Sequence, residues 1–280
     1  MEKSSHQVKV KVMDANELYD PEFRELIKSK NPTIIIPVGS LEQHGAHLPV
    51  STDSDIVTEI ASRLAKKCRF IVFPAINYGI SFEHEPLFNT SITHQRFGNY
   101  IESIIGSLSK NGIKSIIILN GHHGNISVVE QLMSYVTNPN RIQLRGTNRT
   151  KTSQDGRNFI MKRTKQIQTR FQKEFKDVSL KAYSYWHFMK HEFDHAGFVE
   201  TSIMLAISDK VKMKKAKMGL IITNMAEADK EKLKKRATRP GGFPKVAENG
   251  VWGDPTNATK KDGEKFLAEI VRNLAKECQS

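Results

Sequence analysis

The fold is decided by the run Thr33-Ile-Ile-Ile-Pro-Val38 and the loop that follows it, Gly39-Ser-Leu-Glu-Gln-His-Gly-Ala-His-Leu-Pro-Val-Ser-Thr-Asp53. The first six residues have the apolar composition and the length expected of a buried parallel strand that ends at Gly39. Open α/β sheets bind their ligands at the carboxyl ends of the strands. The loop therefore begins where such a fold places its chemistry.

The side chains of this loop are of the kinds that bind metal ions. Its two histidines and three carboxylates have no Lys or Arg between them: Glu42, His44, His47, Asp53 and Asp55. Imidazole and carboxylate groups suit zinc, iron and manganese. The alternative is an ordinary solvated loop.

A second strand repeats the same pattern. The apolar run 114–120 leads directly into Gly121-His-His-Gly-Asn125, and a helix is predicted over 127–136. Two glycines permit a tight turn and a close approach of the backbone. If the two strands are neighbours in a parallel sheet, both loops meet at one edge, which brings His122 to the first cluster.

A third segment, Phe193-Asp-His-Ala-Gly-Phe-Val-Glu-Thr-Ser202, opens an apolar helix and contains His195 and Glu200. Carboxylates are favoured at helix N-termini by the helix dipole, so a purely structural capping role for Glu200 is a real alternative to metal binding. For His195 the alternative is a capping role or the orientation of a ligand.

The remaining periodicity predicts one α/β domain over residues 1–280, with helices on both faces of the sheet. Asp20 is predicted to cap a helix whose first residue is Pro21, and Thr93 to cap a helix through Lys110 that has Tyr100 on its apolar side. Further strands are expected at 70–74 and 182–186. Further helices are expected at 53–67, 159–175 and 259–276, with a partly helical, lysine-rich stretch at 210–239.

The irregular segment between Ile76 and Ile92 is long enough to suggest function. Its polar residues are expected to line a pocket, and they are Tyr78, Ser81, Glu83 and His84. We expect Ser81, His84 and the loop residue His123 to contact substrate. No G-x-S-x-G pattern surrounds Ser81, which argues against a serine nucleophile.

The net charge of +13 is concentrated in two segments. Residues 141–181, a predicted basic insertion, carry 12 Lys or Arg against 3 Asp or Glu, and residues 209–239 carry 11 against 4. Such segments can be solvated faces, can steer an anionic substrate, or can bind nucleic acid. Nucleic-acid binding on an inactive hydrolase scaffold is the non-enzyme alternative, but no recognition motif supports it.

Composition excludes other classes. No apolar run reaches the roughly 18 residues that a membrane-spanning helix requires, and the first residues lack the apolar core of a signal peptide. Cys68 and Cys278 do not make a disulfide framework, and neither is near the His/Glu cluster in sequence. We therefore expect a cytoplasmic protein without thiolate ligands.

The chemistry that these residues favour is metal-dependent hydrolysis. The candidate ligands are Glu42, His44, Asp53, His122 and Glu200. Five ligands exceed the usual three of a catalytic zinc and suit two metal ions that share one carboxylate, for which Asp53 is the candidate. His195, five residues before Glu200, is placed to give a proton to a leaving nitrogen.

Three motifs carry a resemblance to a known family. They are Glu42-Gln-His-Gly-Ala-His-Leu-Pro-Val-Ser-Thr-Asp53, Asn120-Gly-His-His-Gly-Asn125 and His195-Ala-Gly-Phe-Val-Glu-Thr-Ser202, and Val251-Trp-Gly-Asp-Pro255 is similar to the family's C-terminal signature. In their order and spacing they resemble the creatininase (creatinine amidohydrolase) family.

The resemblance implies a three-layer α/β/α sandwich, a homohexamer, and hydrolysis of amide-type C–N bonds with two divalent ions, which are Zn, Fe(II) or Mn. It implies metal ligands at Glu42, His44, Asp53 and His122. Creatinine-hydrolysing members carry a Glu at the position of Gly124 and a Trp at that of His191; members without that Glu use the residue equivalent to Glu200.

Activities in the family include creatinine hydrolysis, deformylation of a ribosylaminopyrimidine phosphate in flavin and deazaflavin biosynthesis, and peptide cleavage. Because Gly124 and His191 depart from the creatinine-hydrolysing pattern, we predict a formamide hydrolase that acts on a small, anionic, nucleotide-like substrate, with creatinine or a peptide as the alternatives. Lys and Arg near the mouth would help to capture such a substrate.

Overall fold

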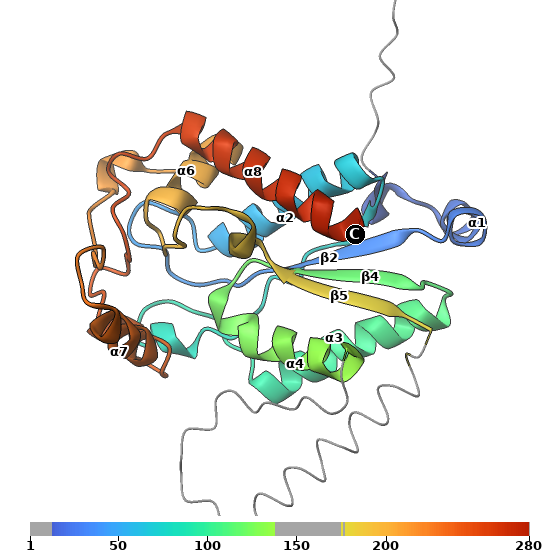
Figure 1. Ribbon diagram of the computed structural model, residues 1–280, viewed down its shortest axis with the longest axis horizontal. Helices are drawn as coiled ribbons and strands as arrows, with labels where there is room; N and C mark the ends of the chain where they lie inside the picture. The colour runs from blue at the N-terminus through green and yellow to red at the C-terminus, as the bar shows by residue number, and fades with distance from the viewer. Residues whose placement is uncertain (1–12, 138–174, 176, 280) are drawn as a thin grey trace, which may run out of the picture.

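A parallel sheet forms the centre of the molecule (Figure 1). The computed structural model describes residues 13–137, 175 and 177–279. Within that part of the chain the sheet has five strands in the order β1-β3-β2-β4-β5. The strands are β1 (Met13–Asp14), β2 (Thr33–Val38), β3 (Ile71–Val72), β4 (Ser115–Asn120) and β5 (Ser179–Ser184). All neighbouring strands pair in parallel.

The sheet has a topological switch point between β2 and β4. From β2 the chain first adds β3 on one side and later adds β4 on the other, so the direction of winding reverses between them. Such a reversal is the point at which doubly wound sheets bind ligands, beyond the carboxyl ends of the strands. β2 and β4 pair from Thr33 opposite Ser115 to Val38 opposite Asn120, so both predicted ligand loops leave the sheet side by side.

Helices cover both faces of the sheet, which confirms the predicted three-layer α/β/α sandwich (Figure 1). α2 (Thr52–Cys68), α6 (Phe198–Ile207) and α8 (Lys260–Gln279) lie on one face, and α3 (His94–Lys110) and α4 (Ile126–Thr137) on the other. Alternate strand residues feed the two cores: Ile35 packs with the first group of helices, whereas Ile34 and Ile36 pack with the second. This alternation follows from the two-residue period of a strand.

Several predicted elements differ in detail. α1 (Asp20–Lys30) has Tyr19, not Asp20, as its N-cap, because the Asp20 carboxylate accepts hydrogen bonds from Arg24 Nε one turn later. The predicted strand 70–74 is reduced to β3, since Pro74 has no N–H to continue a ladder. Tyr100 is 53% exposed and does not belong to the apolar side of α3.

The strand predicted at 182–186 begins earlier, because β5 spans Ser179–Ser184 and a 3₁₀ turn follows at Tyr185–Phe188. The predicted helix 159–175 lies outside the described residues except for Phe175, and so does most of the basic segment 141–181. No helix in the described part of the chain combines the length and the apolar character that crossing a membrane requires.

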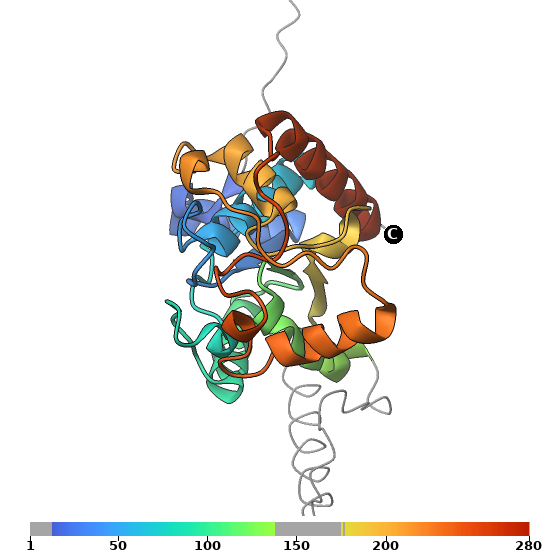
Figure 2. The same ribbon diagram turned by 90° about the vertical axis from the view of Figure 1, so that its left-hand side faces the viewer.

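The lysine-rich helix α7 (Glu227–Ala237) lies at the end of the molecule toward which the strands point (Figures 1 and 2). It exposes most of its side chains and contributes only Ala237 to the buried residues. Its last turn contains Lys234, Lys235 and Arg236. One of the two basic segments therefore stands beside the carboxyl ends of the strands.

Candidate metal centre and active site

Five buried residues converge from four segments at the switch point. Glu42 and His44 follow β2 and His122 follows β4, whereas Asp53 and Glu200 lie in the first turns of α2 and α6. Each is at most 3% exposed. The structure thus brings together all the residues that the sequence nominated as metal ligands.

Asp53 lies between the two histidines of this group. Its Oδ1 is 3.1 Å from His44 Nε2, and its Oδ2 is 3.0 Å from His122 Nδ1. Glu200 Oε2 approaches His44 Nε2 to 3.6 Å, and Glu42 Oε2 approaches His122 Nε2 to 3.3 Å. Asp53 thus turns one carboxylate oxygen toward each of the two histidines.

Backbone carbonyls fix the rings of both histidines. His44 Nδ1 lies 3.1 Å from Glu42 O, and His122 Nε2 lies 2.8 Å from Ile80 O. A carbonyl only accepts, so these nitrogens carry the protons of the neutral rings. The other nitrogen of each ring then turns an unprotonated lone pair toward Asp53. Metal-binding histidines are held in this way by their second N–H.

The buried charges call for cations. Burial opposes ionisation of the imidazoles, but Asp53 and Glu200 overcome it and raise the pKa of His44 to about 10. Burial likewise opposes the charge on His122, yet Glu42 and Asp53 hold its pKa well above the ordinary value. Without other cations the carboxylates are balanced by protons on histidine, whereas a divalent ion would replace those protons.

Unpartnered oxygens support the same conclusion. Both oxygens of Glu42, Asp53 Oδ2 and Glu200 Oε1 are buried and accept no hydrogen bond, although histidine nitrogens lie close to the first three. Glu42, His44 and Asp53 can offer ligand atoms within 4.8 Å of one another, and so can His44, His195 and Glu200. A buried oxygen without a partner is costly, and coordination removes that cost. The residues are therefore positioned to bind divalent metal.

Asp194, rather than Glu200, accepts from the N–H groups in the first turn of α6. The carboxylate of Asp194 accepts hydrogen bonds from Val199 N at 2.8 Å and Glu200 N at 3.3 Å, which satisfies the first turn of α6. Glu200 Oε2 instead accepts from Ala196 N at 2.6 Å, which aims the side chain into the centre. Burial and the charge of Asp53 raise the pKa of Glu200 to about 8 even though His44 opposes the shift.

His195 stands beside the cluster and faces the pocket. Its ring stacks on His44 with centroids 4.2 Å apart, and its Nδ1 lies 3.8 Å from Glu42 Oε1. Its Nε2 lies 3.0 Å from Gln43 O and 3.1 Å from the Gln43 side-chain amide. One partner accepts and the other donates, so either tautomer of the neutral ring has a partner. Burial, together with the charges of His44 and His84, holds the pKa of His195 well below its ordinary value.

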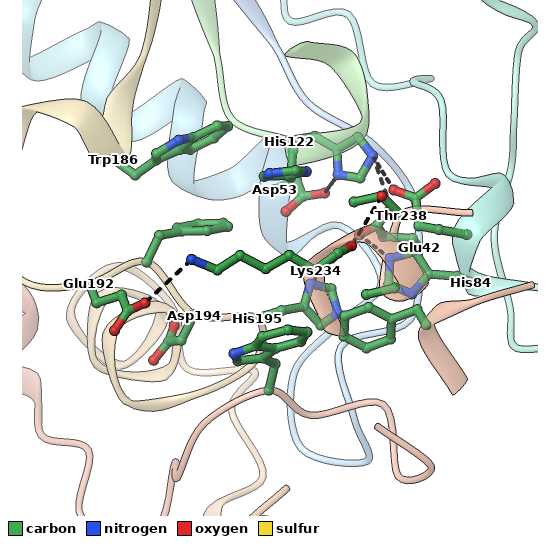
Figure 3. Close-up of a pocket in the computed structure, with 16 residues that line it drawn as sticks. Glu42, Asp53, His84, His122, Trp186, Glu192, Asp194, His195, Lys234 and Thr238 are labelled. Atoms are coloured by element: carbon green, nitrogen blue, oxygen red, sulfur yellow. Dashed lines mark hydrogen bonds and ion pairs between the residues drawn. The ribbon is translucent and has the colours of Figure 1, made fainter. Parts of the chain in front are cut away.

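A cavity of about 270 Å³ opens over the cluster (Figure 3). Glu42, Asp53, His122 and His195 form part of its lining, and His84 and His123 also face it. Among the predicted pocket residues, Glu83 lines the cavity. Tyr78 does not line it and is 54% exposed to solvent. Ser81 is buried beneath the lining, where its hydroxyl contacts Ser40 and His122.

Comparison with known proteins gives a consistent picture. A family model described as creatininase, creatinine amidohydrolase, matches residues 16–278. The chain belongs to the creatininase family. It is therefore a hydrolase of amide-type C–N bonds, as the motifs predicted. Among curated relatives, the mycofactocin precursor peptide peptidase of Mycolicibacterium smegmatis is 27% identical over 256 residues, which are 89% of this chain and 85% of that protein.

Two further relatives bear on the fold and on the range of substrates. The 2-amino-5-formylamino-6-ribosylaminopyrimidin-4(3H)-one 5'-monophosphate deformylase of Methanobrevibacter ruminantium is 36% identical over 118 residues, which are 37% of this chain and 46% of that protein. A solved mutant creatininase of Zn–Zn type superposes with a TM-score of 0.70 at 21% identity and covers 95% of this chain and 97% of that one. The second likeness confirms the creatininase fold.

The backbone leaves no room for a side chain at Gly124, where creatinine-hydrolysing creatininases are expected to carry Glu. A Cβ on Gly124 would lie 2.0 Å from Ile80 O and 2.5 Å from His122 Nε2. His191, at the predicted position of the creatininase Trp, is exposed, packs on Phe198 and Phe266, and does not line the cavity. Gly124 thus lies against the His122 ring, whereas His191 lies outside the lining of the cavity.

The other loop residues lie outside the centre. His47 Nε2 contacts Thr201 Oγ1 at 2.9 Å and so ties the first loop to the residue after Glu200. Asp55 accepts from Ser51 Oγ at 2.9 Å. His47 therefore holds the first loop against the start of α6.

Several lining residues were not singled out from the sequence. Trp186, Phe193 and Phe243 form apolar walls, and Lys234 of α7 crosses the mouth toward Glu192, with 3.8 Å between Nζ and Oε1 (Figure 3). The lysine-rich composition of 209–239 pointed to this helix but not to one residue. The aromatic residues gave no signal, because aromatics in sequence are as typical of a core as of a pocket wall.

Proposed function

We propose that this creatininase-family hydrolase binds two divalent ions through Glu42, His44, Asp53, His122 and Glu200, with Asp53 shared, and uses them to cleave a C–N bond. The single observation that supports this most strongly is the placement of Asp53 between two ring nitrogens whose opposite nitrogens bond to backbone carbonyls. When bound, such ions supply an activated water and polarise a carbonyl oxygen. The ligand set accepts Zn, Mn or Fe(II) alike.

The protein's own part in the reaction is to position the substrate and to move a proton. We propose that His195 delivers a proton to the leaving nitrogen, because it faces the cavity and its Nε2 has both an acceptor and a donor in Gln43. A ring that is stable in either tautomer can take up a proton on one nitrogen and release it again. His195 is 12% exposed, which gives it access to the substrate.

We propose that the substrate is planar, anionic and formamide-bearing, similar to the formylaminopyrimidine ribonucleotide of flavin and deazaflavin biosynthesis. Trp186 and Phe193 pack with centroids 4.7 Å apart on one wall, and an aromatic wall favours a planar ring. Lys234 provides a positive charge at the mouth, and its contact with Glu192 is long enough for an anion to replace it. His84 and His123, which also line the cavity, remain proposed substrate contacts.

Peptide cleavage is the second candidate, because the peptidase relative covers much more of this chain than the deformylase does. Creatinine is disfavoured by the closed backbone at Gly124. The family's homohexamer remains a prediction.

A panel of substrates tests the proposal on protein loaded with Zn, Mn or Fe(II). Formate should be released from the formamidopyrimidine ribonucleotide, and Glu42→Gln should abolish that release. Cleavage of peptides without any deformylation would replace the proposed substrate by the second candidate. Tight binding of nucleic acid by a protein that takes up no metal would instead favour the non-enzyme alternative.

A further inference from the structure

Gln43 occupies a position in the site that the reaction outlined above does not explain. It follows Glu42 directly, is 9% exposed, and lies between the rings of His84 and His195. Gly45 N donates to Gln43 Oε1 at 3.0 Å, which fixes which end of the amide is oxygen. The oxygen end also packs against Gly250, where a Cβ would lie 1.9 Å from Oε1. The amide nitrogen therefore points to the two histidines.

This orientation determines the protonation of His84. Gln43 Nε2 lies 3.0 Å from His84 Nδ1, and because an amide NH₂ only donates, Nδ1 is the acceptor. The proton of the neutral His84 ring is then on Nε2. That nitrogen lies 3.0 Å from Glu42 Oε1, so an N–H, not a lone pair, faces the carboxylate.

We propose that Gln43 is a positioning residue that sets the tautomer of His84, so that His84 turns an N–H toward Glu42 Oε1 and orients this carboxylate for the metal. Two hydrogen bonds lead from the backbone N–H of Gly45 through Gln43 to His84, and a 3.0 Å contact leads on from His84 Nε2 to Glu42 Oε1. Under this assignment His84 is not itself a metal ligand. One of its nitrogens does lie within 4.8 Å of possible ligand atoms of Glu42 and His195. The inference rests on the proposed metal binding by Glu42.

The chain of contacts predicts a coupling that a merely structural glutamine would not show. Groups that hydrogen-bond to metal-binding side chains typically contribute roughly 10- to 100-fold in metal affinity. Gln43→Met keeps the length of the side chain but removes the donor, and His84→Ala removes the group that it orients. If Gln43 acts through His84, the double variant binds metal no more weakly than His84→Ala alone.

The test measures Zn²⁺ affinity by competition with a chromogenic chelator, together with metal content, for the wild type, Gln43→Met, His84→Ala and the double variant. Gln95→Met, at an exposed glutamine of α3, is the matched control and should bind as the wild type does. We expect each single variant to bind roughly 10- to 100-fold more weakly. Melting of the metal-free proteins shows whether each variant folds.

Gln43→Leu serves as a second variant if Gln43→Met does not fold. It has no amide donor for His84 Nδ1 and adds no charge beside the proposed metal site. Weaker metal binding is again expected. Wild-type affinity in both Gln43 variants, or effects of Gln43→Met and His84→Ala that multiply, would overturn the inference and leave the metal centre intact.

Loss of a whole ion in His84→Ala, with both ions retained in Gln43→Met, would make His84 a ligand and also overturn the assignment. If the wild type itself takes up no divalent ion, the proposed function fails, and this inference fails with it.

Discussion

Replacing Glu200 by Gln separates its proposed role as a metal ligand from a role in holding the chain. The amide keeps the shape and leaves an oxygen for Ala196 N, but it removes one negative charge. Glu200 Oε2 lies 3.6 Å from His44 Nε2. A cation bound by both side chains would therefore lie within about 4 Å of the Glu200 carboxylate. Two unit charges about 4 Å apart interact by about 4 kcal/mol at an effective dielectric constant near 20, so affinity for a divalent ion should fall by at least about a thousandfold.

The same substitution should have the opposite effect on the metal-free protein. Burial and Asp53 raise the pKa of Glu200 to about 8, so the folded state favours the protonated carboxyl. Because of this raised pKa, Glu200 stabilises the fold at low pH, and this stability is lost as the pH rises from the ordinary carboxyl pKa to about 8. The substituted amide cannot ionise, so the metal-free Glu200→Gln variant should lose less stability than the wild type across this range. Thermal melts of metal-free protein at several pH values measure the difference.

The assay therefore combines chelator competition, metal content and melting. Weak metal binding together with an unchanged or higher alkaline melting temperature supports the ligand role, and excess metal should partly restore activity. Wild-type affinity for both ions would refute the reasoning and return Glu200 to a structural role. A general loss of stability at all pH values would show that the amide disturbs α6, and the metal affinity could not then be assigned to the lost charge.

Three further predictions address the other residues. Asp53→Ala should remove more than one ion's worth of metal, because the two proposed ions would share its carboxylate; two retained ions with wild-type turnover would contradict this. His195→Asn should keep its metal and lower kcat by roughly 10²–10⁴, and added metal should not restore it. Lys234→Met should raise KM for an anionic substrate at low salt and leave kcat unchanged. The KM of an uncharged analogue should stay the same. Equal effects on both substrates would show that Lys234 only forms part of the pocket wall.

The elements that the sequence predicts well are those whose burial is one-sided or complete. β2 and β4 are six-residue strands that contain the apolar runs 34–38 and 116–119, and α2 and α8 place their apolar residues on one face. In each case hydrophobic burial alone determines the element. The errors occur where a local contact competes: Asp20 pairs with Arg24 instead of capping, and Pro74 cuts a strand short.

The nominated cluster could be predicted because its residues sit just beyond strand ends or in first turns, so strand order alone brings them together. The pocket walls could not be predicted in this way. Trp186 reaches the cavity through a 3₁₀ turn after β5, and Lys234 reaches it from a helix that exposes most of its side chains. Their positions depend on how separate segments pack, which periodicity does not specify. The role of Gln43 likewise depends on which end of its amide faces the rings.

The structure explains why a fifth carboxylate would come from α6 and not from the loop after β4. At Gly124 the chain passes so close to Ile80 O and His122 Nε2 that any side chain would displace one of them. Displacing Ile80 O would remove the carbonyl that fixes the His122 ring, so a Glu introduced there would disturb one ligand in order to supply another. Glu200 lies on the His44 side of Asp53, where Asp194 already satisfies the helix N-terminus and frees the glutamate from capping. Introducing Glu in place of Gly124 alone is therefore not expected to convert this protein into a creatinine hydrolase, since the backbone between Ile80 and His122 would have to open first.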